Sequence, residues 1–191
     1  MIRSKSDLIE YLHRDMEFYY SQGKWERFLH WVTNDPIWYI ARYIRLLRSE
    51  EYYYNTGKSK VGTLLYLYAL NRKNKLGNRL GIKIPKNCFG PGLTIYHHGE
   101  IIVNETAQIG ANCVLHGGNC IGNNGKEDIS PIIGSGLDLG IGAKIIGQVN
   151  LGNNVRVGAN AVVTKSFSGD DIILVGVPAC KKAKEISCEY N

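Results

Sequence analysis

The stretch LGIGAKIIGQVNLGNNVRVGANAVV, residues 139–163, decides the fold, because an aliphatic residue recurs in it at every sixth position. The same period extends back to residue 103. Ten positions in this frame carry only Val, Ile or Leu: Val103, Ile109, Leu115, Ile121, Ile133, Leu139, Ile145, Leu151, Val157 and Val163. Six of them are followed by glycine: Gly110, Gly122, Gly134, Gly140, Gly152 and Gly158. A short repeat that stays in phase over this length predicts a solenoid.

The repeat indicates a coil with flat sides. Each six-residue unit gives one short extended side, three sides complete a turn, and each turn buries its aliphatic residues on those of its neighbours. We expect the glycine to supply backbone freedom at the corner. The polar segment GNNGKEDISPI separates Ile121 from Ile133. These two residues are still two six-residue units apart, but the segment between them lacks the aliphatic pattern. This segment is predicted to be a loop that leaves the coil.

The first eighty residues differ from the repeat, since their apolar residues have helical spacing. Three such stretches lie at 7–20, 38–54 and 60–80, and Asp35-Pro36 is a helix-start signal before the second. Pro85 and the turn-rich NCFGPG that follows it indicate a boundary. The sequence therefore predicts an α+β protein of three parts: a helical N-terminal region (1–84), a repeat domain (85–180) and a C-terminal tail (181–191).

Composition limits the class of protein. The longest apolar run, VGTLLYLYAL, is half the roughly 20 residues that a membrane span needs, and the N-terminus has no apolar signal-peptide core. The cysteines are odd in number and form no CxxC pair: Cys88, Cys113, Cys120, Cys180 and Cys188. This pattern argues against a disulfide framework or a zinc ribbon and for a cytoplasmic protein.

The net charge of +6 is unevenly distributed. Residues 42–90 carry eleven Lys or Arg against Glu50 and Glu51 alone. Such a segment forms either a solvated helical face or a contact with an anionic surface, and we keep both alternatives. Contact with the inner face of a membrane is the hypothesis that this charge raises. No nucleic-acid motif accompanies it, so nucleic acid is not an expected partner.

At this point the chain resembles the hexapeptide-repeat acyltransferases, a superfamily with a left-handed parallel β-helix. Three segments resemble its serine O-acetyltransferase branch: GLTIYHHGEIIVNETAQIGANC (92–113), LGIGAKIIGQVNLGNNVRVGANAVVTKSF (139–167) and VGVPAC (175–180). The resemblance covers about half of the chain. It implies that the repeat domain is a left-handed β-helix and that the protein is an acetyl-CoA-dependent O-acetyltransferase.

The departures from this branch fall on its acceptor site. The family's catalytic histidine is kept as His97. The aspartate that helps to hold the serine amino group is replaced by Tyr96, and the aspartate that orients the histidine is replaced by Ile82. The later D-R-H-P motif becomes Asp-Ile-Ser-Pro at 128–131, without its arginine and histidine. The resemblance thus implies a base without the family's amino-acid site.

The pattern GPGLTIYHHG, with His116 and a glycine two repeats later, resembles instead the O-acetyltransferases of bacterial surface-polysaccharide synthesis. We therefore expect transfer of an acetyl group to a hydroxyl of a sugar or surface-polysaccharide precursor. Two alternatives stay open. One is a serine O-acetyltransferase of cysteine biosynthesis, and the other is a non-catalytic β-helix scaffold.

Histidine suits this chemistry, because a neutral imidazole can take the proton of the attacking hydroxyl. His97 lies one repeat unit before Val103, where a regular coil would point it into the core, but the resemblance makes it the base. His98 precedes His116 by three repeat units, which make one turn of the coil, so these two should stack. We predict His97 as base, His116 as an acceptor-site or orienting residue, and His98 as the fallback base.

The group that orients His97 is left open by the sequence. Glu100 and Glu105 are the closest acids, and a backbone carbonyl is equally suitable. Metal is not expected. Some β-helix proteins resemble carbonic anhydrases and have two histidines five apart in one coil, but no second histidine follows His116 at that spacing.

The resemblance also implies where acetyl-CoA binds, in a cleft between two β-helices of a homotrimer. The residues that match its lining are Ile141, Gly142, Ala159 and, in the loop 123–126, Asn123, Gly125 and Lys126. Four lysines are either phosphate partners or plain surface residues: Lys144, Lys165, Lys181 and Lys182.

Overall fold

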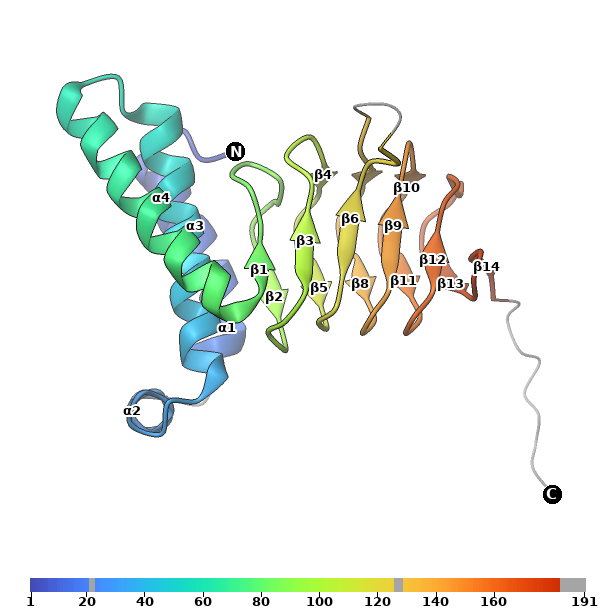
Figure 1. The fold of residues 1–191 in the computed structure, drawn as a ribbon, viewed down its shortest axis with the longest axis horizontal. Coiled ribbons are helices and arrows are strands. Elements are labelled where there is room, and N and C mark those ends of the chain that lie inside the picture. The colour runs from blue at the N-terminus through green and yellow to red at the C-terminus, as the bar shows by residue number, and fades with distance from the viewer. Residues whose placement is uncertain (21–22, 126–128, 183–191) are drawn as a thin grey trace.

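The structure is a computed structural model, and it describes residues 1–20, 23–125 and 129–182. A layer of helices lies across the N-terminal end of a coil of short strands (Figure 1). The helices are α1 (Lys5–Tyr20), α2 (Lys24–Val32), α3 (Pro36–Thr56) and α4 (Lys60–Leu80). The predicted α+β fold class, helices followed by a parallel β-helix, is confirmed.

The strands of the coil are two or three residues long. They are β1 (Ile82–Lys83), β2 (Thr94–Ile95), β3 (Ile101–Val103), β4 (Gln108–Ile109), β5 (Val114–Leu115), β6 (Cys120–Gly122), β7 (Ile132–Ile133), β8 (Asp138–Leu139), β9 (Lys144–Ile146), β10 (Asn150–Leu151), β11 (Arg156–Val157), β12 (Val162–Val163), β13 (Ile173–Val175) and β14 (Cys180–Lys181). Sheet A has the order β1-β3-β6-β9-β12, sheet B β10-β7-β4, and sheet C β14-β13-β11-β8-β5-β2. Neighbouring strands are parallel except β13 and β14.

The helix ends follow local chemistry. Asp35 caps α3, because its side chain accepts a hydrogen bond of 2.8 Å from the Ile37 N–H, and Pro36 stands at the first position. Ser59 caps α4 in the same way, and Gly81 ends it in the left-handed region with φ 67°. The sequence analysis missed α2, which is nine residues long and has no side-chain cap. The domain boundaries at 84 and 180 stay a prediction.

The strand register confirms the period read from the sequence. Arg156 pairs with Asp138, so one coil consists of three repeat units. The ten aliphatic residues of the repeat point inward, and none is more than 6% exposed. Ile132 pairs with Gln108, a step of four repeat units instead of three, because the loop after β6 adds one unit to that coil. The predicted loop therefore leaves the coil; its residues 126–128 lie outside the described part.

Five of the six repeat glycines are required for space rather than for an unusual backbone angle, and Gly122 is the exception. None of the six has a positive φ. A Cβ added at Gly110 would lie 2.6 Å from the Ser135 nitrogen, and one added at Gly134 would lie 2.6 Å from the Gly152 carbonyl oxygen. The expectation of corner freedom at these glycines is therefore wrong, because the next coil passes too close for a side chain. The left-handed turns come from other residues, among them Asn112, Asn154 and Asn160.

Arg48 joins the helical layer to the first coil. Its guanidinium is fully buried and lies 2.7 Å from Asp15 of α1 and 2.9 Å from Glu51 of α3. It also donates to the carbonyl oxygens of Phe89, at 3.0 Å, and Gly90, at 2.7 Å. Five N–H groups in a planar fork allow one side chain to hold both layers.

Asp15 completes this junction from the other side. Its Oδ1 accepts hydrogen bonds from the backbone N–H of Gly92, at 2.7 Å, and of Leu93, at 2.8 Å. One turn later on α1, the Tyr19 hydroxyl accepts from the Ile95 N–H and donates to the Ile95 carbonyl oxygen. The start of sheet C is thus bound to α1 by hydrogen bonds between α1 side chains and the backbone of residues 92–95.

We predict that Gly110→Ala lowers the free energy of unfolding by about 1–3 kcal/mol, because a rigid backbone opposes the added methyl group. Gly122→Ala is the matched control at the same repeat position, since its Cβ would have no neighbour closer than 3.9 Å. Urea unfolding followed by circular dichroism measures both. Equal losses in the two variants would contradict the spacing argument.

We predict that Arg48→Ala destabilises the protein by about 3–5 kcal/mol, because two buried carboxylates lose their counter-charge. Arg45→Ala, on the same helix but exposed, should cost about 1 kcal/mol or less. Thermal unfolding at neutral pH compares the two. A loss below about 1 kcal/mol for Arg48→Ala would show that the junction does not depend on this residue.

Candidate active site

The predicted histidines lie on one edge of the coil. At this edge the chain passes from sheet C to sheet A, at residues 96–100, 116–119, 140–143 and 158–161 in successive coils. We call it the histidine edge. It holds His97 and His98 in the first of these corners and His116 in the second. The corners stack because the coils stack (Figure 1).

The first corner contains two extra residues. Ile95 pairs with Leu115, and Val103 pairs with Ile121. Val103 follows Ile95 by eight positions, whereas Ile121 follows Leu115 by only six. Glu100 takes a left-handed conformation with φ 47°, and Gly99 has φ 103°. The Gly99 N–H donates to the carbonyl oxygen of Leu80 at 2.8 Å, so the end of α4 holds this corner.

The insertion changes the expected positions of both histidines. His97 and His98 are exposed. The argument that a regular coil points His97 into the core is wrong, because the inward position of this side is taken by Ile95, which is fully buried. His97 lies beside Gly117 of the next coil, where an added Cβ would be 3.3 Å from the His97 Cβ. The glycine leaves room next to the imidazole-bearing residue.

Tyr96, and not His98, contacts the ring of His116, in an edge-to-face arrangement. The two rings are perpendicular, with centroids 4.8 Å apart. The predicted stack of His98 on His116 is therefore wrong, since the two extra residues shift the alignment of these coils by two positions. Phe18 of α1 lies 5.0 Å from the Tyr96 ring on the other side. The helical layer thus reaches the site through one aromatic row.

His116 forms a dyad with an acid that the sequence analysis did not select. Its Nε2 lies 2.8 Å from Oδ1 of Asp138, and Arg156 Nε lies 3.1 Å from Oδ2 of the same carboxylate. An ionised carboxylate only accepts hydrogen bonds, so in a neutral His116 imidazole Nε2 would donate to Asp138 and Nδ1 would keep its lone pair. About a third of the His116 and Asp138 side chains is exposed, so a substrate can reach them.

A sequence signal for this dyad existed. Asp138 and Arg156 occupy the same position of the repeat, the residue before a buried aliphatic, and they are one coil apart. Opposite charges at that spacing must meet on adjacent coils. This spacing points to the pair of Asp138 and Arg156 and not to His116. His116 is offset along the strand from Asp138 and does not occupy the same position of the repeat.

The sequence suggested two acids that could orient His97. Among the described residues, neither of them forms a hydrogen bond to it. Glu100 and Glu105 are both exposed, and Glu105 belongs to the next corner, between sheets A and B. Ile82, at the place of the family's orienting aspartate, is a core residue of β1 paired with Ile101. Among the described residues, the acid that contacts a histidine of this edge is Asp138 of β8, which pairs with His116.

The predicted cofactor residues divide between two edges. Ile141, Gly142 and Ala159 lie on the histidine edge, in the two corners beyond His116. Ile141 is 55% exposed, and the Gly142 N–H donates to the Gly117 carbonyl oxygen at 2.8 Å. Asn123 and Gly125 lie across sheet A, in the loop after β6. Lys126 lies outside the described residues.

The candidate lysines are spread more widely. Lys144 donates to the Gly142 carbonyl oxygen at 3.1 Å, which places it beside the histidine edge. Lys165 lies over the Phe167 ring, and Lys181 donates to the Ser168 carbonyl oxygen at 2.7 Å. The last two lie toward the C-terminal end of the coil. All of these cofactor assignments, including Lys182, stay predictions.

None of the four cysteines in the described part of the chain lies on the histidine edge. Desolvation raises the pKa of the Cys88 thiol to about 12 and also raises that of Cys113. Burial raises the pKa of Cys120 on sheet A as well. Within residues 1–20, 23–125 and 129–182, no group of three His, Cys, Asp or Glu side chains could hold a metal ion. The histidines of this edge can transfer protons through their imidazole groups.

Comparisons with known proteins point to one group. No protein-family model matches the chain. A serine acetyltransferase of Synechococcus elongatus is 34% identical over 101 residues, which are 51% of this chain and 41% of that protein. One of Staphylococcus aureus is 36% identical over 101 residues, 51% of this chain and 47% of that protein. The chain spans about half the length of the curated relatives it matches.

Solved structures show the same fold. Serine acetyltransferase of Brucella abortus superposes with a TM-score of 0.72 at 21% identity, over 94% of this chain and 70% of that one. The enzyme of Neisseria gonorrhoeae gives a TM-score of 0.70 at 24% identity, over 96% and 69%. Related structures of these two proteins are described as complexes with coenzyme A and with serine.

These findings support a hexapeptide-repeat fold of the acetyltransferase type and correct the predicted acceptor. The relatives and solved structures are serine acetyltransferases, so the prediction of a sugar or surface-polysaccharide acceptor is wrong and its serine alternative is favoured. The prediction rested on the pattern GPGLTIYHHG and on the absence of the family's acceptor-site residues at positions 82, 96 and 128–131. The loss of one way of binding serine does not identify another acceptor.

Proposed function

We propose that this protein is an acetyl-CoA-dependent O-acetyltransferase that acetylates the hydroxyl group of serine. The observation that carries the proposal is the histidine edge: an exposed His97 beside an oriented His116–Asp138 dyad, on a coil like those of serine acetyltransferases. The dyad provides a half-exposed acid–base pair, and the edge continues past it to Ile141 and Gly142, where the resemblance puts coenzyme A.

The reaction needs one proton acceptor and no enzyme nucleophile. The serine hydroxyl oxygen attacks the thioester carbonyl while His97 takes its proton, forming a tetrahedral oxyanion. Collapse breaks the carbon–sulfur bond, and the protonated His97 returns the proton to the sulfur of coenzyme A. Backbone N–H groups of the glycine-rich corners are suited to stabilise the oxyanion.

The acceptor side differs from the family pattern, and we infer that His116 takes over part of its role. With Nε2 held by Asp138, Nδ1 of His116 is free to accept from the serine ammonium group, and Arg156 balances the Asp138 charge. Tyr96 fixes the His116 ring from one side. His98, exposed in the same corner, is the fallback base.

Acetyl-CoA is proposed to lie along the histidine edge, over Ile141, Gly142 and Ala159. Asn123 and Gly125 of the loop after β6 are further candidate contacts for acetyl-CoA, as is Lys126, which lies outside the described residues, and Lys165 and Lys181 are its candidate phosphate partners. We infer a homotrimer, because such a cleft needs a second β-helix. Exposed isoleucines on the flat sides of the coil support this, with Ile102 51% and Ile132 52% exposed. A cytoplasmic location is part of the proposal.

We predict that His97→Ala lowers kcat for L-serine acetylation by about 10²–10⁴-fold, the usual contribution of a general base. Release of the coenzyme A thiol measures the rate, and His13→Ala, exposed on α1, is the matched control. A full loss in His98→Ala or His116→Ala with His97→Ala active would move the base to that residue. No turnover of serine in the wild type would overturn the proposed function and favour a non-catalytic scaffold.

We predict that Asp138→Asn lowers kcat by roughly 10–100-fold and leaves the KM for acetyl-CoA unchanged, because it disturbs the orientation of His116 and not the cofactor. Arg156→Gln keeps the dyad and should cost less than about fivefold, as expected for an exposed ion pair. A rise in the KM for acetyl-CoA with kcat preserved would show that Asp138 belongs to the cofactor site instead.

A further inference from the structure

Buried ion pairs leave the surface of α3, α4 and the first strand with cations only. Glu50 and Glu51 are 2% and 1% exposed, and they pair with Lys73 and Arg48. These are the only acids of residues 42–90. Nine cations of the same segment are exposed or half-buried: Arg42, Arg45, Lys58, Lys60, Arg72, Lys75, Arg79, Lys83 and Lys86. No carboxylate of the segment accompanies them at the surface.

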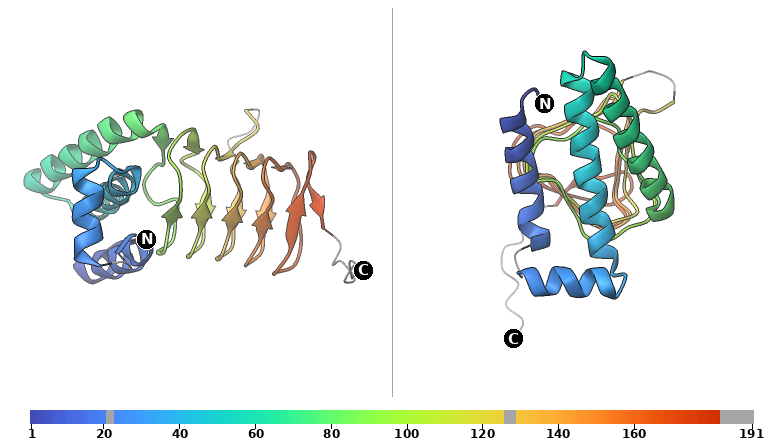
Figure 2. Two further views of the ribbon diagram at one scale, coloured as in Figure 1. Left: turned by 90° about the horizontal axis from the view of Figure 1, so that it is seen from below. Right: turned by 90° about the vertical axis from the view of Figure 1, so that its left-hand side faces the viewer.

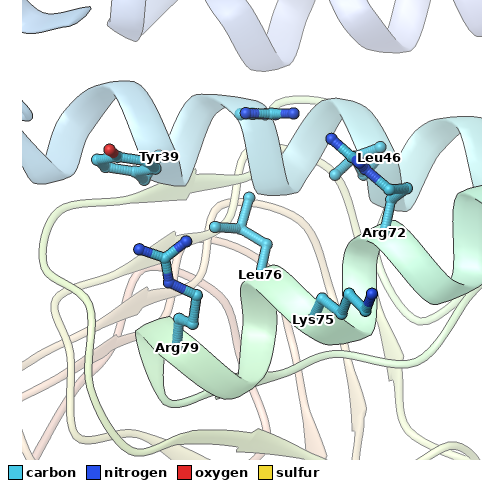
Figure 3. A pocket seen from close by; sticks show the side chains of 7 residues that line it. Tyr39, Leu46, Arg72, Lys75, Leu76 and Arg79 are labelled. Atoms are coloured by element: carbon cyan, nitrogen blue, oxygen red, sulfur yellow. The ribbon is translucent and has the colours of Figure 1, made fainter.

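One stripe of α4 combines apolar and cationic residues. In its first half Val61, Leu64 and Tyr68 are 65%, 66% and 63% exposed. Its second half continues the same helical face with Arg72, Lys75 and Arg79, at spacings of three or four residues. These three cations and Arg42 of α3 line a groove of about 330 Å³ between the helices (Figure 3).

The neighbouring α2 is also amphipathic, but its apolar side faces solvent and its polar side faces the protein. Its large apolar side chains point to solvent, between 41% and 69% exposed: Trp25, Phe28, Leu29, Trp31 and Val32. Its polar side faces the protein instead, where Arg27 lies over the Tyr20 ring and His30 pairs with Asp35. A helix of a monomeric globular protein buries its apolar side, so this one lacks its partner.

Both features belong to the layer that covers the end of the coil. In the right-hand view of Figure 2, α3 and α4 stand in front of the coil and α2 crosses below them. In Figure 3 the strands lie behind the groove. We call the α4 stripe, the groove and the apolar side of α2 the outer helical face. The outer helical face lies across the end of the coil, and the histidine edge runs along its side. The two approach each other at the first corner, where the carbonyl oxygen of Leu80, next to Arg79, accepts from the Gly99 N–H.

We propose that the outer helical face docks on an anionic lipid membrane. Acidic headgroups would pair with the cations of the groove, and the tryptophans of α2 would enter the interfacial region, which suits aromatic rings. Within the described part of the chain, no helix has the length and apolar character to cross a membrane, so the contact is peripheral.

Charge favours the membrane over a two-fold contact with a second copy of the chain. A two-fold interface brings the same patch against itself, and a patch with cations and no acids of its segment would repel its copy. An anionic bilayer supplies the missing negative charge and the apolar partner together. This inference does not rest on the proposed acetyl transfer.

Sedimentation with vesicles tests the proposal with the full chain. We expect binding to phosphatidylglycerol–phosphatidylcholine vesicles at low salt and none to phosphatidylcholine alone. Arg72→Gln with Lys75→Gln should weaken binding about thirtyfold, since each cation near an anionic leaflet contributes about 1 kcal/mol. Arg3→Gln with Lys5→Gln makes the same charge change at the start of α1 and should weaken binding much less.

Tryptophan fluorescence tests the role of α2. On anionic vesicles the emission should shift to shorter wavelength, and Trp25→Ala with Trp31→Ala, which leaves only Trp38, should abolish the shift. No binding to anionic vesicles, or equal weakening in the two double charge variants, would overturn the proposal. So would concentration-dependent association without lipid that Trp25→Ala with Trp31→Ala removes, since the face would then belong to a second copy.

Discussion

The stacking of each coil on the next, at the roughly 4.8 Å spacing of paired strands, is the constraint on which the rest of this structure depends. It places every residue beside the residue one coil away. Inside, this produces a continuous column of buried aliphatic side chains. At the corners it leaves no room for a Cβ at Gly110 or Gly134, so the repeat keeps glycine there. At the histidine edge it brings side chains from successive corners together.

An open coil end would expose this aliphatic column, and the helical layer covers it. The contact is more than apolar, since Arg48 and Asp15 bind backbone groups of residues 89–93 through buried charged hydrogen bonds. These hydrogen bonds fix the position of the helical layer on the first coil, because each buried charge needs all of its partners. Phe18 of the same layer contacts the Tyr96 ring, and Tyr96 contacts the His116 ring. Two aromatic contacts thus link the helical layer to His116.

The charges of the helical region have two separate uses. Arg48 and Lys73 are buried and pair with Glu51 and Glu50, the only acids of residues 42–90. No carboxylate of this segment is therefore left for its remaining cations. The composition of the segment therefore understates how positive its surface is. The histidine edge has the opposite character, since its Arg156 is matched by Asp138. Acyl transfer and surface attachment would use different faces of the molecule.

The sequence by itself determined the coil, because a six-residue period fixes which residues are buried whatever the details of the corners. It also determined the three long helices and the loop after β6, since caps, prolines and polar interruptions are local signals. The resemblance carried by its motifs identified the histidine corner. Only the tertiary structure decided how that corner is built. Two extra residues before Val103 shift the alignment of the coils, so Tyr96 rather than His98 meets His116. Asp138 reaches His116 diagonally from the next coil, an offset that counting repeat units does not reveal. The orientation of α2 and the burial of Arg48 follow from packing between distant segments. A periodic sequence determines what is inside, whereas contacts between irregular positions depend on the whole fold.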